Sequence, residues 1–387
     1  MASTPMDVDD AVSTPTAPPP PPAPVLNIQR TLGSNVPSTT KISDVMANFR
    51  PMKLFRRDDV KDTRSKPSVL SIDFDDPGEL CITSESDETL MIYNVKEGRH
   101  DKKLLSQKYG VKLAKFTHAS SMILFASTKE NDAVRYLSTH NTQFIRYFEG
   151  HTAPVTSISV HPGADNFISS GRDDTVHLWA LNARNWVGKL HITTPFLSAW
   201  DPSGNVFGIA SPWSFTILLY DYKNYTKGPI SEFDLVEKMP SPRAAEALAT
   251  GWTTFAFSND GKHILLGTRG PAHYLFDAFT GNLKAILRKP DGTATRRAGA
   301  GEVHDPNRLE SSGDCCFAPD GRYVLSGSKK DILVWDTLGS SGEDKVLDPL
   351  YTLEEKREAA VLAFNPRYNM FASADQELMF WLPDPHA

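Results

Sequence analysis

The sequence has little cysteine, with only Cys81, Cys315 and Cys316 in 387 residues. None forms a C-x-x-C pair, so the pattern indicates neither a disulfide framework nor a zinc knuckle. The start, "MASTPMDVDD", lacks the basic and apolar regions of a secretory leader, and no apolar run approaches membrane-spanning length. These absences favour a soluble intracellular protein with reduced thiols, in the cytosol or the nucleus.

Neither sign of charge predominates. The chain has 41 basic and 47 acidic residues, a formal net charge of -6. A protein that binds nucleic acid through bulk electrostatics carries an excess of positive charge, and a single-strand binder needs a basic stripe with interleaved aromatics. We therefore expect no direct contact with nucleic acid.

Motifs that carry chemistry are also missing. The eleven histidines show no H-E-x-x-H or comparable metal spacing, and no G-x-x-x-x-G-K-[ST] phosphate loop occurs. Cys315 and Cys316 are adjacent in an expected strand, where their side chains alternate between faces, which is typical of core cysteine. We expect no cofactor, no bound metal and no enzymatic activity.

Residues 1–41 form a distinct N-terminal tail. Acidic "DVDD" precedes "TPTAPPPPPAPV", which contains five consecutive prolines. Such a segment cannot bury enough apolar surface to offset its chain entropy, so we expect a disordered acidic and proline-rich leader. The alternative is a polyproline ligand for an aromatic groove.

From residue 42 to residue 387 the chain repeats one plan seven times. Each unit begins with the end of one strand, followed by a turn that contains Pro, Gly, Asn or Asp. A second strand, a short polar turn and a third strand that ends in an aromatic residue complete the unit. The units span residues 74–93, 116–136, 160–179, 200–220, 257–276, 317–335 and 364–381. A short fourth strand follows most units. The pattern predicts an all-β, seven-bladed β-propeller.

The last unit lacks its fourth strand. "LMFWLPDPHA" supplies a third strand, and only five residues follow Leu382. An unassigned apolar stretch, "NFRPMKLFRR", precedes the first unit. A propeller ring avoids an exposed edge when its N-terminal strand completes the last blade. We therefore predict that residues 52–56 pair with the strand that ends at Trp381.

The third unit, "GHTAPVTSISVHPGADNFISSGRDDTVHLWA", resembles a WD repeat. This resemblance implies that His151, Ser169, Asp173 and Trp179 form a buried hydrogen-bonded tetrad. A His, a Ser and an Asp in one blade also suggest a hydrolase triad. The structural role is favoured, because Ser169 falls within a strand instead of on an exposed elbow.

Small and apolar residues predominate in the strands expected to line the channel, with Asp73 and Lys115 as exceptions. We interpret these two as a locally paired structural charge. An enzyme would instead need acidic, His or metal-binding side chains that converge at one mouth of the channel. An interaction module is the leading hypothesis and a propeller enzyme the weaker one.

Four stretches resemble one family more closely: "SQKYGVKLAKFTHASS", "DAVRYLSTHNTQFIRYFEGH", "KGPISEF" and "NPRYNMFASADQELMFWLP". They look like the WD-repeat subunit of COMPASS, the Set-domain complex that methylates lysine 4 of histone H3. This resemblance, over roughly residues 45–383, implies a non-catalytic nuclear scaffold that contacts the Set-domain methyltransferase subunit.

In fungi that subunit is shared with the cleavage and polyadenylation factor, which implies contacts with 3'-end processing and phosphatase-associated subunits and a link to transcribing RNA polymerase II. The alternatives are a generic WD-repeat adaptor of another nuclear or cytosolic complex, or a propeller-fold hydrolase. Two long polar insertions, residues 237–251 and 288–313, depart from the family pattern between repeats, where loops tolerate length.

The turns between the second and third strands of the units map one face of the ring. Turns one and seven are acidic, at Glu85, Asp87, Glu88, Asp375 and Glu377. The other turns offer basic and aromatic residues: Lys129, Arg172, Trp213, Phe215, Arg269, Lys329 and Lys330. Cations beside exposed rings suit a phosphorylated peptide such as the polymerase tail, and an ordinary solvated rim is the alternative.

Overall fold

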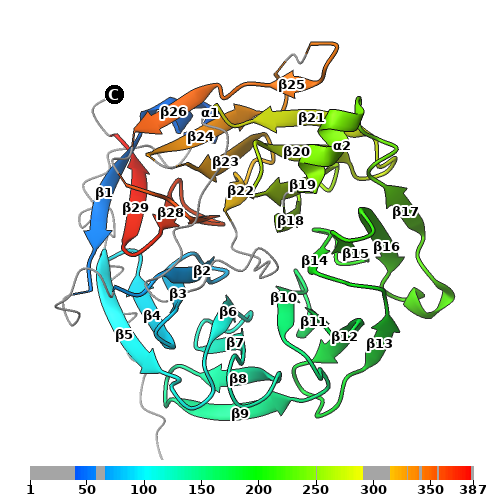
Figure 1. Cartoon of the computed structure of the whole chain (residues 1–387). Helices are drawn as coiled ribbons and strands as arrows, with labels where there is room; N and C mark the ends of the chain where they lie inside the picture. The colour runs from blue at the N-terminus through cyan, green and yellow to red at the C-terminus, as the bar shows by residue number, and fades with distance from the viewer. Residues whose placement is uncertain are drawn as a thin grey trace, which may run out of the picture.

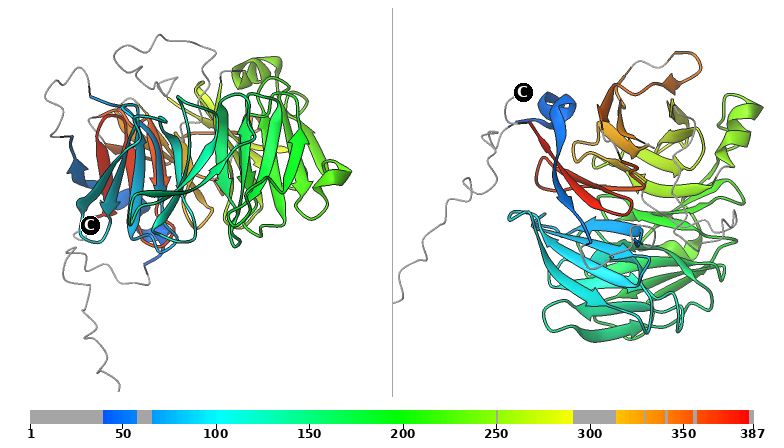
Figure 2. Two further views of the ribbon diagram at one scale, coloured as in Figure 1. Left: turned by 90° about the horizontal axis from the view of Figure 1, so that it is seen from below. Right: turned by 60° about the vertical axis from the view of Figure 1, so that its left-hand side comes forward.

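The computed structural model describes residues 40–57, 66–249, 251–290, 314–328, 330–339, 342–354 and 357–384. The tail predicted for residues 1–41 lies outside this range except for its last two residues. Seven sheets surround a central channel, as predicted for an all-β propeller (Figure 1). Seen from the side, the sheets form a disc (Figure 2). Within the described chain, no helix is both long and apolar enough to cross a membrane.

Each blade contains four antiparallel strands, named a to d from the channel outward, and blade five has one additional strand. Blade one comprises β2 (Val69–Phe74), β3 (Leu80–Glu85), β4 (Thr89–Asn94) and β5 (Arg99–Leu105). Blade two comprises β6 (Lys112–Phe116), β7 (Met122–Ala126), β8 (Val134–Ser138) and β9 (Gln143–Phe148). Blade three comprises β10 (Val155–Val160), β11 (Asn166–Gly171), β12 (Thr175–Ala180) and β13 (Gly188–His191).

Blade four comprises β14 (Leu197–Trp200), β15 (Val206–Ser211), β16 (Thr216–Asp221) and β17 (Ser231–Asp234), and blade five comprises β18 (Trp252–Phe257), β19 (His263–Thr268), β20 (Ala272–Asp277) and β21 (Leu283–Arg288). Blade six comprises β22 (Cys315–Phe317), β23 (Tyr323–Gly327), β24 (Asp331–Asp336) and β26 (Tyr351–Glu354). Blade seven comprises β27 (Val361–Phe364), β28 (Phe371–Ala374), β29 (Leu378–Pro383) and β1 (Phe49–Phe55).

The turns between strands a and b explain the Pro, Asp and Gly clusters of the repeat. Gly78, Gly204, Gly261 and Gly321 occupy equivalent turns with φ of +71°, +71°, +70° and +70°. A residue with a Cβ is strained in this left-handed region, whereas glycine is not. In blades one, four, five and six, the glycine therefore fixes the tight turn that leads the chain from strand a to strand b.

The ring closes as predicted, through antiparallel pairing of β1 with β29. The register runs from Phe49 opposite Pro383 to Phe55 opposite Leu378, so the closing strand begins three residues earlier than expected. A register shift falls between Pro51 and Lys53, where proline has no N–H to donate. Fully buried Phe49 anchors the strand in the core.

Blade five has a fifth strand that the repeat pattern does not predict. The connection between strands c and d of blade six runs back to blade five, where β25 (Val346–Leu347) pairs in parallel with β21. The Lys345 ammonium also donates to the Leu283 carbonyl over 2.8 Å. The chain thus covers the outer edge of one of its own blades.

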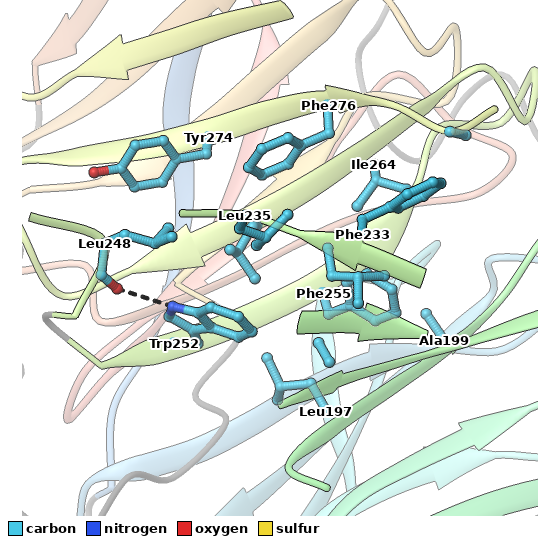
Figure 3. Packing of buried hydrophobic residues seen from close by; sticks show 14 of the residues in the cluster. Leu197, Ala199, Phe233, Leu235, Leu248, Trp252, Phe255, Ile264, Tyr274 and Phe276 are labelled. Atoms are coloured by element: carbon cyan, nitrogen blue, oxygen red, sulfur yellow. Dashed lines mark hydrogen bonds between the residues drawn. The ribbon is translucent and has the colours of Figure 1, made fainter. Parts of the chain in front are cut away.

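Short helices lie outside the blades: α1 (Ile42–Val45), η2 (Met46–Asn48), η3 (Tyr225–Lys227) and α2 (Pro242–Leu248). The first insertion contains α2, capped by the Ser241 hydroxyl, which accepts from the Ala244 N–H over 3.3 Å. Buried Leu248 joins the core of blades four and five, and its carbonyl accepts from the Trp252 indole over 2.9 Å (Figure 3). Most of the second insertion lies outside the described residues.

Candidate functional site

The four residues implied by the WD resemblance meet inside blade three. His151 Nε2 lies 2.8 Å from Ser169 Oγ, and its Nδ1 lies 3.1 Å from Asp173 Oδ1. The Trp179 indole donates to the same Ser169 hydroxyl over 2.9 Å. The tetrad connects the loop before strand a with strands b and c.

The surroundings of the tetrad set its protonation. Burial alone would raise the pKa of the Asp173 carboxyl, but hydrogen bonds from His151, the Thr152 N–H and Thr175 outweigh burial and hold that pKa well below its ordinary value. His177 stacks on His151 with ring centroids 4.5 Å apart. Burial, and secondly His151, lower the pKa of His177 to about 3.

The tetrad contains the Ser, His and Asp of a hydrolase triad, but a substrate could not reach them. Ser169 is fully buried, with 0% of its surface exposed, and its oxygen already accepts the Trp179 indole N–H. A nucleophilic serine needs an open approach to its Oγ. The geometry therefore supports a structural tie and not a catalytic centre.

Equivalent tryptophans lie in two other blades, and only one of them keeps the bond to a serine hydroxyl. In blade seven, the Trp381 indole donates to Ser373 Oγ over 2.9 Å. In blade six, the Trp335 indole N–H has no hydrogen-bond partner among the described residues. Ser326 lies instead 2.7 Å from His273 Nε2 of blade five. Sequence reasoning missed His273, because no Gly-His pair marks it.

The central channel holds a cavity of about 660 Å³. Its charged residues pair with each other, since the Lys115 ammonium lies 2.8 Å from Asp73 Oδ1. Asp73 Oδ2 also accepts the Phe116 N–H over 2.8 Å. Across the channel wall, Ser157 and Ser198 share a hydroxyl contact of 3.0 Å. The pairing supports our interpretation of Asp73 and Lys115 as structural.

His273, Asp314 and Cys315 form a buried group whose potential ligand atoms lie within 4.8 Å of one another. Both His273 nitrogens are occupied, because Nδ1 accepts the Thr268 N–H over 3.0 Å and Nε2 contacts Ser326. Asp314 accepts the Thr253 hydroxyl over 2.5 Å. This arrangement suits a hydrogen-bonded network between blades five and six better than a metal site.

The predicted basic and aromatic face is only partly available to a ligand. Arg172 and Lys330 are exposed, and Trp213 is 53% exposed. Lys129 forms an ion pair with Glu88 of turn one, and Arg269 is half-buried near Asp314. Lys329 lies outside the described residues.

Phe215 corrects the expectation of two exposed rings in turn four. It has φ of +54° and packs half-buried against the core of blades four and five, with its ring centroid 6.4 Å from that of Trp252. The left-handed backbone turns the side chain inward, so Trp213 alone presents a ring to solvent in this turn.

The acidic turns are paired with basic residues that follow the closing strand. Buried Arg57 contacts Glu85 of turn one, and its other nitrogen lies 2.9 Å from Asp87. Burial raises the pKa of Glu85 to about 7 against the opposing charge of Arg57. In turn seven, Glu377 lies 2.9 Å from the Lys66 ammonium.

Seven four-stranded blades and the Trp-Ser-His-Asp tie define the chain as a WD-repeat β-propeller. A family model described as "WD domain, G-beta repeat" matches residues 142–180 and 311–336.

Three relatives are similar over most of the chain. COMPASS component SWD2 of Saccharomyces cerevisiae is 35% identical over 321 residues, which cover 82% of this chain and 91% of that protein. WD repeat-containing protein 82 of Drosophila melanogaster is 33% identical, covering 88% and 96%. Set1 complex component swd2 of Schizosaccharomyces pombe is 30% identical, covering 87% and 98%. The chain belongs to the family of WD-repeat proteins that these relatives represent, which confirms the resemblance seen in its sequence.

Proposed function

We propose that this protein is a non-catalytic scaffold subunit of a COMPASS-type histone H3 lysine 4 methyltransferase complex in the nucleus. The observation that carries the proposal is similarity along almost the whole length of relatives named as Set1 complex and COMPASS components. The site geometry also supports a non-catalytic role, because the tetrad residues and the charged residues of the channel make hydrogen bonds and ion pairs with one another.

The same scaffold would serve the cleavage and polyadenylation factor and its phosphatase-associated subunits, and so link both assemblies to transcribing RNA polymerase II. The family resemblance supports this part of the proposal. A propeller offers several turn faces to different partners at once.

Affinity purification from cells with a tagged copy at the native locus tests the assignment. Mass spectrometry should recover the Set-domain methyltransferase as a major partner, and subunits of the cleavage and polyadenylation factor in a separable fraction. Recovery of neither assembly, in a preparation where the propeller itself is intact, would reject the proposal in favour of another WD-repeat adaptor.

For direct contact with the polymerase, we propose the face that carries Arg172, Trp213 and Lys330. Exposed cations and an exposed indole ring in turns of this face suit the phosphate and the tyrosine and proline of the tail. Arg172→Glu with Lys330→Glu should weaken binding of phosphorylated tail peptide by about tenfold.

These two substitutions are preferred to Arg269→Glu, because an acidic residue there would face buried Asp314 and perturb the fold. Lys41→Glu, a charge reversal near the ring closure, is the matched control. Titration with phosphorylated and unphosphorylated peptides gives the readout. Equal affinities for both peptides in both proteins would leave this face an ordinary solvated rim.

A further inference from the structure

Exposed apolar side chains concentrate on the connections between strands c and d. Of the thirteen large hydrophobic residues that are exposed in the described chain, six lie on these connections in blades three to six: Trp186, Val187, Ile230, Phe279, Leu338 and Leu350. Equivalent connections in blades one and two carry none. Clustered exposed apolar residues of this kind mark interaction surfaces.

The exposed apolar residues on these connections lie closest together in blades three and four. Trp186 and Val187, 46% and 48% exposed, precede β13, and Ile230, 57% exposed, precedes β17. Both strands lie on the perimeter of the ring (Figure 1). The Tyr225 hydroxyl of blade four donates to the Val187 carbonyl over 3.3 Å, so the two connections are in contact.

Three exposed cations share these connections: Arg184 in blade three, and Lys223 and Lys227 in blade four. Within the described chain none of the three forms an ion pair. The acidic residue of the same turn, Asp221, is occupied by the Lys223 N–H at 2.8 Å and the Asn224 amide at 2.7 Å. The surface thus combines positive charge with exposed apolar area.

We propose that the three apolar residues and three cations of blades three and four form a docking surface for an acidic protein segment with interspersed apolar side chains. The apolar residues of the partner would cover Trp186, Val187 and Ile230, and its carboxylates would pair with Arg184, Lys223 and Lys227. Trp and Arg are the residues most often found at the energetic centre of protein interfaces. Charge complementarity would add specificity and speed of association.

The four-stranded sheets do not require this composition, although the Trp186 ring also contacts buried His177, with ring centroids 6.0 Å apart. Blades one and two carry Lys96 and His140 in the corresponding connections and form the same four-stranded sheets. Lys227 and Ile230 belong to "KGPISEF", a stretch singled out from the sequence, yet both are exposed. A protein segment fits the surface better than nucleic acid, because apolar residues make up half of it and the chain carries a net charge of -6.

Carbodiimide crosslinking of the complex purified from its own cells tests the contact chemistry, because this reagent joins a lysine directly to a carboxylate. Lys223 or Lys227 should crosslink to Asp or Glu in an apolar-containing segment of another subunit. The internal Lys66–Glu377 pair, 2.9 Å apart, reports that the reaction has worked. The proposal does not depend on which complex holds the chain.

Trp186→Ala combined with Ile230→Ser should then lower recovery of the crosslinked subunit about tenfold, with only a small fall in melting temperature from the lost contact between the Trp186 and His177 rings. Lys223→Glu with Lys227→Glu should do the same. Leu105→Ser, at an apolar residue that is 61% exposed elsewhere, is the matched control and should leave recovery unchanged. Absence of inter-subunit crosslinks at both lysines, crosslinks only to RNA, or full recovery with both double variants would overturn the proposal.

Discussion

Blades three and seven reach the same four-stranded sheet by opposite routes. Blade three is built from consecutive strands between Val155 and His191 and carries the complete polar tetrad. Blade seven takes three strands from the C-terminal end and one from the N-terminal region, and of the tetrad it retains only the contact from Trp381 to Ser373.

Aromatic packing compensates in blade seven. Phe49 of the closing strand lies 5.3 Å from Phe371, which stacks on Trp381 at 5.2 Å between ring centroids. A blade with local connections is held by a polar tie, and a blade closed by distant segments is held by apolar area. Since distant pairing carries a larger entropic cost, we expect the ring to be most vulnerable at blade seven.

Removal of the closing strand should have the largest effect. Deletion of residues 1–57 exposes the edge of β29 and uncovers the core around Phe371, so the protein should aggregate or melt at a much lower temperature. Deletion of residues 1–40 should leave the melting temperature nearly unchanged, as expected for a disordered tail. A soluble protein of residues 58–387 with wild-type heat resistance would refute the importance of closure.

Within blade three, His151→Ala or Asp173→Ala should lower the free energy of unfolding by about 1 to 3 kcal/mol, because each leaves buried polar partners unsatisfied. Binding of partners should fall only in proportion to the unfolded fraction. Denaturant titration and partner recovery, measured on the same samples, check this. A stable His151→Ala protein that lost a hydrolytic activity of the wild type would contradict the structural role.

Acid should weaken blade three through His177. Its pKa is 6.5 in the unfolded chain and about 3 in the fold, so the neutral form is the one that folding favours. The stabilisation that comes from the low pKa of His177 is fully present above pH 6.5 and is lost as the pH falls. Between pH 7 and pH 5 the free energy of unfolding should decrease by about 1 to 2 kcal/mol. His177→Phe should reduce the fall in melting temperature over that interval. An unchanged pH profile would show that His177 does not titrate as inferred.

The three tryptophans provide a finer comparison. Trp179→Phe and Trp381→Phe each remove an indole hydrogen bond as well as ring volume, whereas Trp335→Phe removes volume alone. The first two substitutions should therefore cost about 1 kcal/mol more than the third. Equal losses from all three, measured by denaturant unfolding, would mean that the bonds to Ser169 and Ser373 contribute nothing.

The sequence predicted those parts of the fold that repeat or that follow from a missing part. Seven units with turn residues at fixed places implied seven blades, and the absent seventh outer strand pointed to the stretch that contains β1. The two residues of β25 could not be predicted, because their pairing with β21 is set by the path of a long connection and not by local pattern.

The face of the ring was harder to predict from sequence. Assigning Phe215 to solvent failed because its backbone is left-handed, which residue type does not reveal. The ion pairs of the acidic turns could not be predicted, because Arg57 and Lys66 precede the first unit and meet Glu85 and Glu377 only in three dimensions. The exposed apolar residues between strands c and d could not be predicted, because these connections vary in length and fall outside the repeated pattern.

The most direct test of the proposed function is the level of trimethylated lysine 4 on histone H3 in cells depleted of this protein and supplied with one of three versions: wild type, residues 41–387 or residues 58–387. A scaffold of the methyltransferase complex predicts loss of the mark on depletion, restoration by the first two versions, and no restoration by the version without the closing strand. An unchanged level of the mark after depletion of the protein would contradict the account.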